Sequence, residues 1–196
     1  MRYNTARMNT PIQIIPRIRS LTLENVGCWV SLRLDFIRGV NIITGEPGSL
    51  GKTTVLSSIM SEVCPDNDMG LFAPPVALGK SRIAVELMPS GGTSRASLHG
   101  SIPPITGEES HGQYIMRLLK TCLAMAEPDG AVIFDDEVLG RLDDSHRSKA
   151  VKWLNETTAQ VICVIKRLNR DDFPTARVFS CAWDREGDVA QMSLPQ

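Results

Sequence analysis

One stretch of the sequence combines glycines, a lysine and hydroxyl side chains in a spacing typical of phosphate binding. An apolar strand at 40–43 leads into glycines that let backbone N–H groups turn inward, and a helix begins at Lys52 with the positive end of its dipole at the same point. The lysine supplies a charge for the β- and γ-phosphates of a nucleotide, and the Thr53 hydroxyl can ligate magnesium. The candidate nucleotide-binding residues of this stretch are Gly45, Gly48, Ser49, Gly51, Lys52, Thr53 and Thr54.

The spacing of this phosphate-binding loop is one residue longer than usual. A glycine is expected five residues before Gly51, but that position is Glu46, and Gly45 comes one residue earlier. Either Leu50 bulges out of the loop, or a tight turn from Gly48 to Gly51 points Glu46 away from the phosphates. A glycine-rich turn without a ligand is the remaining interpretation.

Three acidic residues follow the next strongly apolar segment. Residues 131–134 form a continuous apolar run typical of a strand buried on both faces, and Asp135, Asp136 and Glu137 come directly after it. In an open α/β sheet, ligands bind beyond the carboxyl ends of the strands, where both this cluster and the phosphate-binding loop belong. One carboxylate can hold magnesium and the next can orient the attacking water. The alternative is that the three acids only cap the following turn.

The composition is that of a globular domain with a nearly neutral surface. The chain has 196 residues, of which 42% are hydrophobic and 22% are charged, and its formal net charge is −1. This balance does not indicate general nucleic-acid binding, although local basic patches remain open. The five cysteines form no C-x-x-C pair, which disfavours zinc and disulfides and favours reduced thiols in the cytoplasm. No apolar run approaches the roughly 20 residues of a membrane span.

The order of the expected elements predicts an α/β fold. Residues 1–16 are expected to form a loosely attached N-terminal arm, and residues 17–196 a single nucleotide-binding domain. Periodicity and turn residues predict strands at 17–23, 31–36, 40–43, 131–134 and 161–165, helices at 52–64, 110–127 and 144–158, and hairpins that join 82–88 to 94–99 and 177–183 to 188–192. Strands alternating with helices favour a mostly parallel core sheet flanked by helices, with an N-terminal antiparallel β portion and a C-terminal β-hairpin.

Motifs at matching positions support a family resemblance. Residues 39–45 are similar to a G-x-N-x-I-T-G run, Asp136 and Glu137 to a Walker B pair, and Asp143, seven residues after Asp136, to a D-loop aspartate. Together they resemble the ABC-type P-loop ATPases, and within them the SMC/RecF-like soluble branch, in a compact and degenerate form. The resemblance covers residues 18–166. It implies a P-loop NTPase fold, ATP and Mg²⁺ as cofactors, Thr53 and Asp136 as magnesium ligands, and Glu137 as the water-orienting residue.

A further motif concerns a second copy of the chain. Ser110, Gly112 and Gln113 resemble the family's signature loop, which stands directly before a helix, and His111 replaces its first glycine. The resemblance implies that this loop and Asp143 contact ATP held by a second protomer in a nucleotide-dependent homodimer. The alternative is that Ser110 is an ordinary helix N-cap.

Two departures from the family pattern affect catalysis. Lys166 stands where the family has a switch histidine, and no glutamine occurs between Gln13 and Gln113 to serve as the Q-loop residue. Lysine can still reach the γ-phosphate as a cation, but it cannot act as a neutral hydrogen-bond relay. The expected catalytic residues are therefore Glu137, Lys52 and Lys166, with slow turnover.

The leading functional hypothesis is a compact cytoplasmic ATPase that binds Mg-ATP, dimerises around it and drives a partner protein or a DNA transaction. A second hypothesis is a catalytically weak interaction module in which nucleotide binding orders the dimer. A third is the ATP-binding subunit of a transporter, although the segment between the loop and the signature motif is short for such a subunit. Lys166, Arg167 and Arg170 form a small basic cluster that is either a DNA contact or a solvated loop.

Overall fold

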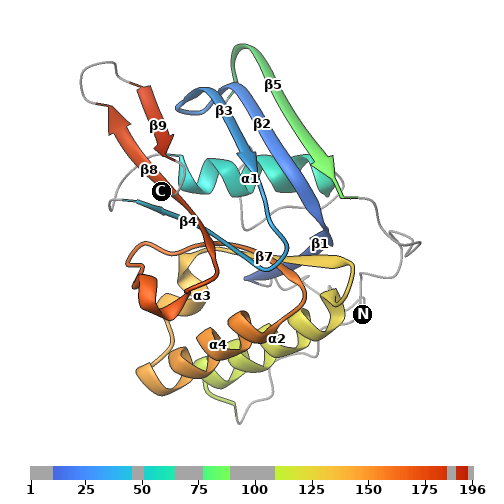
Figure 1. Cartoon of the computed structure of the whole chain (residues 1–196), viewed down its shortest axis with the longest axis vertical. Coiled ribbons are helices and arrows are strands. Elements are labelled where there is room, and N and C mark those ends of the chain that lie inside the picture. Colours follow the sequence, from blue (N-terminus) through green and yellow to red (C-terminus); the bar gives the residue numbers. More distant parts are fainter. Residues whose placement is uncertain (1–10, 46–50, 65–76, 89–108, 185–188, 194–196) are drawn as a thin grey trace, which may run out of the picture.

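The computed structural model describes residues 11–45, 51–64, 77–88, 109–184 and 189–193, which form two sheets flanked by helices (Figure 1). The strands are β1 (Ile12–Pro16), β2 (Ile18–Val26), β3 (Trp29–Asp35), β4 (Val40–Gly45), β5 (Ala77–Leu87), β6 (Gly130–Phe134), β7 (Gln160–Val164), β8 (Arg177–Asp184) and β9 (Val189–Ser193). The helices are α1 (Lys52–Val63), α2 (His111–Ala126), α3 (Asp136–Gly140), α4 (Asp144–Glu156) and the short 3₁₀ helix η2 (Arg170–Asp172). From β4 to β8, successive strands are separated by one or two helices, in the alternation that the sequence predicts.

In the described part of the chain, the larger sheet has six strands in the order β1-β6-β7-β4-β8-β9. The central strands β6, β7, β4 and β8 are parallel, whereas β1 and β9 pair antiparallel at the two edges. Successive residues of a strand point to opposite faces, and both faces are covered, which explains why β6 is buried and apolar throughout. The expectation of a mostly parallel core sheet is confirmed.

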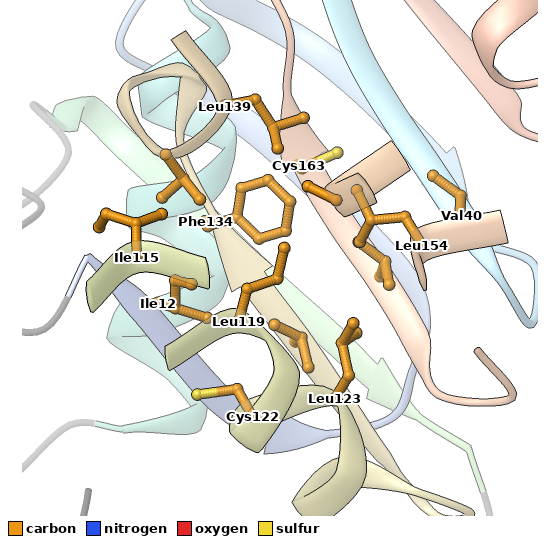
Figure 2. Close-up of a cluster of buried hydrophobic side chains, with 14 of the residues drawn as sticks. Ile12, Val40, Ile115, Leu119, Cys122, Leu123, Phe134, Leu139, Leu154 and Cys163 are labelled. Carbon is orange, nitrogen blue, oxygen red and sulfur yellow. The ribbon is translucent and has the colours of Figure 1, made fainter. Parts of the chain in front are cut away.

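Two hydrophobic clusters cover the two faces of this sheet. On one face, Val132 and Phe134 of β6 pack with side chains of α2, α3 and α4. On the other face, Ala131 and Ile133 pack with α1 and with the smaller sheet. Figure 2 shows Phe134 at the centre of the first cluster, with Leu119 of α2 beside it. Each such fully buried apolar side chain contributes about 1.5–3 kcal/mol of transfer free energy, so both clusters hold the central strands in place.

The smaller sheet, as far as the structure describes it, has antiparallel strands in the order β3-β2-β5 and lies beside α1 (Figure 1). A fully buried glutamine links it to the larger sheet. Gln160 Oε1 accepts a hydrogen bond from the backbone N–H of Ile18 at 2.8 Å, and its Nε2 donates to the carbonyl oxygens of Ile18 and Ile37 at 2.8 and 3.0 Å. Because Gln160 begins β7, this link lies at the end of the strand opposite to the expected site.

Residues 12–16 correct the expectation of a loosely attached arm over 1–16. They form β1, which pairs antiparallel with β6 so that Ile12 lies opposite Phe134. Ile12 and Ile15 are buried, because each joins one of the two hydrophobic clusters. The local pattern of this segment does not reveal the strand, since the partner that completes the pairing is far along the chain.

Other boundaries differ by a few residues. Strand β5 begins at Ala77 and pairs with β2, and the strand expected at 94–99 lies outside the described residues. Helix α2 has Ser110 as its N-cap, and α4 ends two residues before position 158, with Thr157 as its C-cap. The antiparallel pairing of β8 with β9 confirms the C-terminal hairpin. None of the helices in the described ranges is both long and apolar enough to cross a membrane.

Candidate functional site

Glycines stand at both described ends of the expected phosphate-binding loop. Gly45 ends β4 with φ +148°, and Gly51 precedes α1 with φ +115°, backbone conformations that residues with side chains rarely adopt. A Cβ at Gly51 would lie 2.6 Å from Cζ2 of Trp29, and a Cβ at Gly45 would collide with the carbonyl oxygen of Cys181. The fold therefore requires glycine at both positions. Two expected loop residues lie outside the described part of the chain: Gly48 and Ser49.

Lys52 begins α1 and brings a buried cation to this loop. It is 4% exposed, and burial lowers its pKa below the usual value, with Lys166 adding to the decrease and Asp136 opposing it. Thr53 is exposed at the start of the helix, and Thr54 is half-buried. A buried lysine whose charged form is disfavoured gains from a bound anion, because the anion restores the stability of the ammonium.

The three carboxylates that follow β6 have different environments. Asp135 is the N-cap of α3, where its side chain accepts from the backbone N–H of Glu137 at 3.0 Å, and burial raises its pKa above the usual range. Glu137 is exposed and forms an ion pair with Arg141, one turn along α3. Asp136 pairs instead with Lys166, with 2.6 Å between Oδ2 and Nζ. The capping alternative therefore holds for Asp135, while Asp136 reaches the end of another strand.

Lys166 follows β7, and its ion pair with Asp136 joins the end of β7 to the end of β6. Its hydrogen bond to Asp136 raises the pKa of the Lys166 ammonium, so Lys166 is charged at neutral pH. Thr44 Oγ1 donates to the carbonyl oxygen of Ile165 at 2.6 Å, which ties the end of β4 to the end of β7. Strand β7 lies between β4 and β6. The structure thus places Lys52, Lys166 and Asp136 at the carboxyl ends of three adjacent parallel strands.

The second group of expected residues lies at the N-termini of α2 and α4. Ser110 and Gln113 form a capping box, in which Ser110 Oγ accepts from the backbone N–H of Gln113 at 3.2 Å and Gln113 Oε1 accepts from the N–H of Ser110 at 2.9 Å. Asp143 caps α4 and accepts from the backbone N–H of His146 at 2.8 Å. A Cβ at Gly112 would lie 4.0 Å from Nδ1 of this histidine. The two helix N-termini are therefore close neighbours, and the capping box agrees with the N-cap alternative for Ser110.

A hollow of about 280 Å³ borders the acidic cluster and lies between α3, α4 and the end of β7. It is lined by Asp136, Leu139, Gly140, Arg147, Val164, Ile165, Lys166 and Arg167. Among these lining residues, cationic side chains outnumber the single carboxylate. The positive potential that results favours anionic ligands on this side of the site.

The oxygen donors near the loop fit magnesium better than a transition metal. Among the described residues, no group of three or more His, Cys, Asp or Glu side chains is placed to hold a metal ion. Magnesium does not need such a group, because it keeps several waters and takes one or two protein oxygens together with substrate phosphates. The Asp136 carboxylate and the Thr53 hydroxyl are oxygens of this kind.

Comparison with solved structures identifies the fold. The SMC head domain from Thermotoga maritima matches with a TM-score of 0.59 and 14% sequence identity, over 92% of this chain and 99% of that chain. An SMC head bound to the C-winged helix domain of ScpA matches with a TM-score of 0.60 and 12% identity, over 92% and 98%. No protein-family model matches the chain, and no match is found among the curated proteins. The chain has the α/β fold of SMC head domains.

Several neighbours of the site are not predicted by the sequence. Trp29 Nε1 donates to the carbonyl oxygen of Gly51 at 3.3 Å, so the indole packs on the last residue before Lys52. The ion pair between Glu137 and Arg141 could be predicted from the sequence, because residues four apart on a helix are neighbours. The contact between Trp29 and Gly51 could not be predicted from the sequence, since it joins β3 to a residue that is distant along the chain.

Proposed function

We propose that this protein is a compact ABC/SMC-like ATPase that binds and hydrolyses Mg-ATP and uses ATP-sandwiched dimerisation to drive a partner protein or a nucleic-acid transaction. The observation that carries this proposal is the meeting of Lys52, Asp136 and Lys166 at the ends of adjacent parallel strands. In open α/β sheets, this edge is where ligands bind. The fold shared with SMC head domains supports the same class of function.

The phosphates of ATP are proposed to bind between the glycine loop and the N-terminus of α1. Backbone N–H groups of the loop and of Thr53 and Thr54 supply donors, and Lys52 supplies the compensating charge. Thr53 and Asp136 would hold magnesium, which neutralises negative charge on the phosphates when it is bound. The buried position of Lys52 strengthens its interaction with an anion, because water screens it little.

Hydrolysis is proposed to use Glu137 to orient the attacking water and Lys166 to stabilise charge on the γ-phosphate. Both side chains take part in ion pairs in this structure, Glu137 with Arg141 and Lys166 with Asp136. Glu137 and Arg141 are exposed, so rearranging their pair costs little free energy. Lys166 would act by charge alone, which is consistent with slow turnover.

A nucleotide-dependent interaction module with weak catalysis is the second candidate function. The same two ion pairs favour it, because each one occupies a side chain that hydrolysis would need. In both candidates the partner is a second copy of the chain together with another macromolecule. One solved neighbour is an SMC head bound to the C-winged helix domain of ScpA, and we propose a protein partner for this chain by analogy.

Replacing Lys52 by alanine tests phosphate binding. Loss of a charged hydrogen-bond donor should weaken Mg-ATP binding by about 1.5–3 kcal/mol, which is about 10- to 150-fold in affinity. Isothermal titration calorimetry measures this change. Lys149→Ala, at an exposed lysine of α4, is the matched control and should bind like the wild type. Unchanged affinity in Lys52→Ala would show that the loop is not a phosphate-binding site.

Replacing Glu137 by glutamine tests hydrolysis and dimerisation together. The substitution keeps the side-chain shape and removes its basicity, so turnover should fall by about 10²–10⁴-fold while Mg-ATP binding survives. Trapped ATP should then hold two protomers together, giving a dimer in Mg-ATP and a monomer in ADP by size-exclusion chromatography with light scattering. Glu156→Gln, at an exposed glutamate of α4, is the control.

The outcomes of the Glu137→Gln experiment separate the alternatives. Normal hydrolysis would move the catalytic role to Asp135 or Asp136. If Glu137→Gln loses hydrolysis but forms no dimer in Mg-ATP, the wild type is still an ATPase, and the ATP-sandwiched dimer is refuted. Adding Ser110→Arg should abolish the dimer by steric and charge conflict, if the N-terminus of α2 contacts the second protomer.

A further inference from the structure

His146 lies where the N-termini of two helices meet. It occupies the first turn of α4, and it uses both oxygens of the Asp143 carboxylate. Its backbone N–H donates to Oδ1 at 2.8 Å, and its ring Nδ1 lies 2.6 Å from Oδ2. Attachment at both oxygens fixes the rotation of the carboxylate, which a backbone N-cap bond alone would leave partly free. His146 therefore determines the direction in which Asp143 presents its charge.

The same imidazole also faces helix α2. A Cβ added at Gly112 would lie 4.0 Å from Nδ1, so the ring lies close to the first turn of α2. The side chain of His146 is 30% exposed and that of Asp143 is 63% exposed. The ring is thus largely covered, while the carboxylate that it holds is open to an incoming partner.

The first turn of α2 next to this pair presents polar side chains to solvent. Ser110, His111 and Gln113 are all exposed. The capping box fixes the side chains of Ser110 and Gln113 relative to the backbone. The hydrogen bonds from His146 lower the pKa of Asp143, which keeps it a carboxylate at neutral pH. Exposed polar side chains therefore stand at the N-termini of both helices, with His146 in the first turn of α4.

We infer that His146 is a positioning residue: it holds the Asp143 carboxylate in one fixed orientation beside the first turn of α2, so that Asp143 engages a second copy of this chain. The inference rests on the proposed function, because the partner is the nucleotide-dependent dimer. The contribution of His146 is preorganisation. Without the ring, the Asp143 carboxylate would have to be ordered when the protomers associate, which weakens the dimer without affecting the expected phosphate-binding loop.

The test uses the Glu137→Gln protein as the parent, since it is expected to be a dimer in Mg-ATP. His146→Leu in this parent should raise the dimer dissociation constant about tenfold or more and leave Mg-ATP affinity of the monomer unchanged. His146→Asn should restore the dimer, because asparagine Nδ2 can occupy the place of imidazole Nδ1 and donate to Asp143. Lys149→Leu places the same apolar side chain at an exposed position of α4 and should have no effect.

A double-mutant cycle provides a second, independent readout. Asp143→Asn retains the N-cap of α4, because asparagine caps a helix as well as aspartate does. If His146 acts through Asp143, His146→Leu should add little further loss of dimerisation in the Asp143→Asn background. Full additivity of the two losses would overturn the inference.

The results distinguish failure of the inference from failure of the proposed function. A dimeric parent whose His146→Leu variant dimerises equally well overturns the inference alone. So does a variant that loses Mg-ATP affinity or thermal stability in parallel with the dimer, or one that His146→Asn does not rescue, since these indicate a general structural role. A parent that stays monomeric in Mg-ATP overturns the proposed sandwich and this inference with it.

Discussion

Gly51→Ala should be among the most damaging small substitutions at the loop. The backbone of Gly51 has φ +115°, and an added Cβ would lie 2.6 Å from Cζ2 and 2.8 Å from Cε2 of Trp29, and 2.8 Å from Sγ of Cys28. Trp29 is 1% exposed and donates from Nε1 to the carbonyl oxygen of Gly51, so it cannot move away without breaking its own packing. The strain therefore acts on the residue that directly precedes Lys52.

The expected cost follows from two separate effects. Positive φ costs a residue with a side chain about 1–2 kcal/mol, and overpacking in a closed site costs typically about 1–3 kcal/mol. Reduced entropy of the unfolded chain returns about 0.4–1 kcal/mol. Gly51→Ala should therefore lower the free energy of unfolding by about 2–4 kcal/mol. Mg-ATP binding should weaken as well, because the backbone movement that relieves the clash displaces the N-terminus of α1.

Two other glycines separate these effects. Gly39 has φ +88° but open space around its added Cβ, so Gly39→Ala should show backbone strain without a clash and cost about 1 kcal/mol or less. Gly140, in α3, has neither positive φ nor a close neighbour, so Gly140→Ala should stabilise by about 0.4–1 kcal/mol. Urea denaturation followed by circular dichroism measures all three changes.

A background substitution identifies the source of the clash. In a Trp29→Leu protein, Gly51→Ala should cost less than in the wild type, because leucine lacks the indole atoms nearest the added Cβ. If Gly51→Ala costs no more than Gly39→Ala, or if its cost is the same in both backgrounds, then the packing of Trp29 against the loop is not the constraint described above.

The remaining predictions concern charge. Lys166→Ala should lower ATP turnover about tenfold or more while ADP affinity stays unchanged, because only the γ-phosphate is within the proposed reach of Lys166. Steady-state phosphate release measures the turnover, and calorimetry measures the ADP affinity. Equal losses for ATP and ADP would contradict the prediction. The Thr157 hydroxyl and the Thr158 N–H donate to the Glu127 carboxylate at 2.6 and 2.9 Å, and these hydrogen bonds lower the pKa of Glu127. The contribution of Glu127 to stability is therefore present above its unfolded pKa of about 4.3 and is lost as pH falls through the lower folded value. The stability difference between the wild type and Glu127→Gln should therefore shrink in urea denaturation below about pH 4, and a difference that persists undiminished at pH 2 would contradict the assignment.

Local patterns in the sequence were sufficient for the order of the elements and for the residues at the central strand ends. The run at 131–134 predicts a strand buried on both faces, and β6 is such a strand. Lys52 after its glycines, and Asp136 after β6, were selected from residue type and spacing, and the structure places both at one edge of the sheet. These features are local, because the dihedral preferences of glycine and the periodicity of a strand depend on neighbouring residues alone.

Only the tertiary structure shows which distant segments complete the site. Strand β1 is stable through its pairing with β6, the indole of Trp29 supports Gly51, and Gln160 joins the two sheets. Likewise, the sequence does not show that Lys166 pairs with Asp136, since that contact depends on β7 lying beside β6.

The sequence by itself therefore determined which residue types stand at the ends of the central strands, and the tertiary structure decided which of them meet. Each of these meetings joins segments that are far apart in the chain, and their free energy comes from burial and hydrogen bonding across the fold. Closing such long loops is opposed by chain entropy and becomes favourable only when many contacts form together. No single stretch of sequence contains all of these contacts. The pairing of β1, the contact of Trp29 with Gly51 and the partner of Lys166 are therefore seen only in the folded chain.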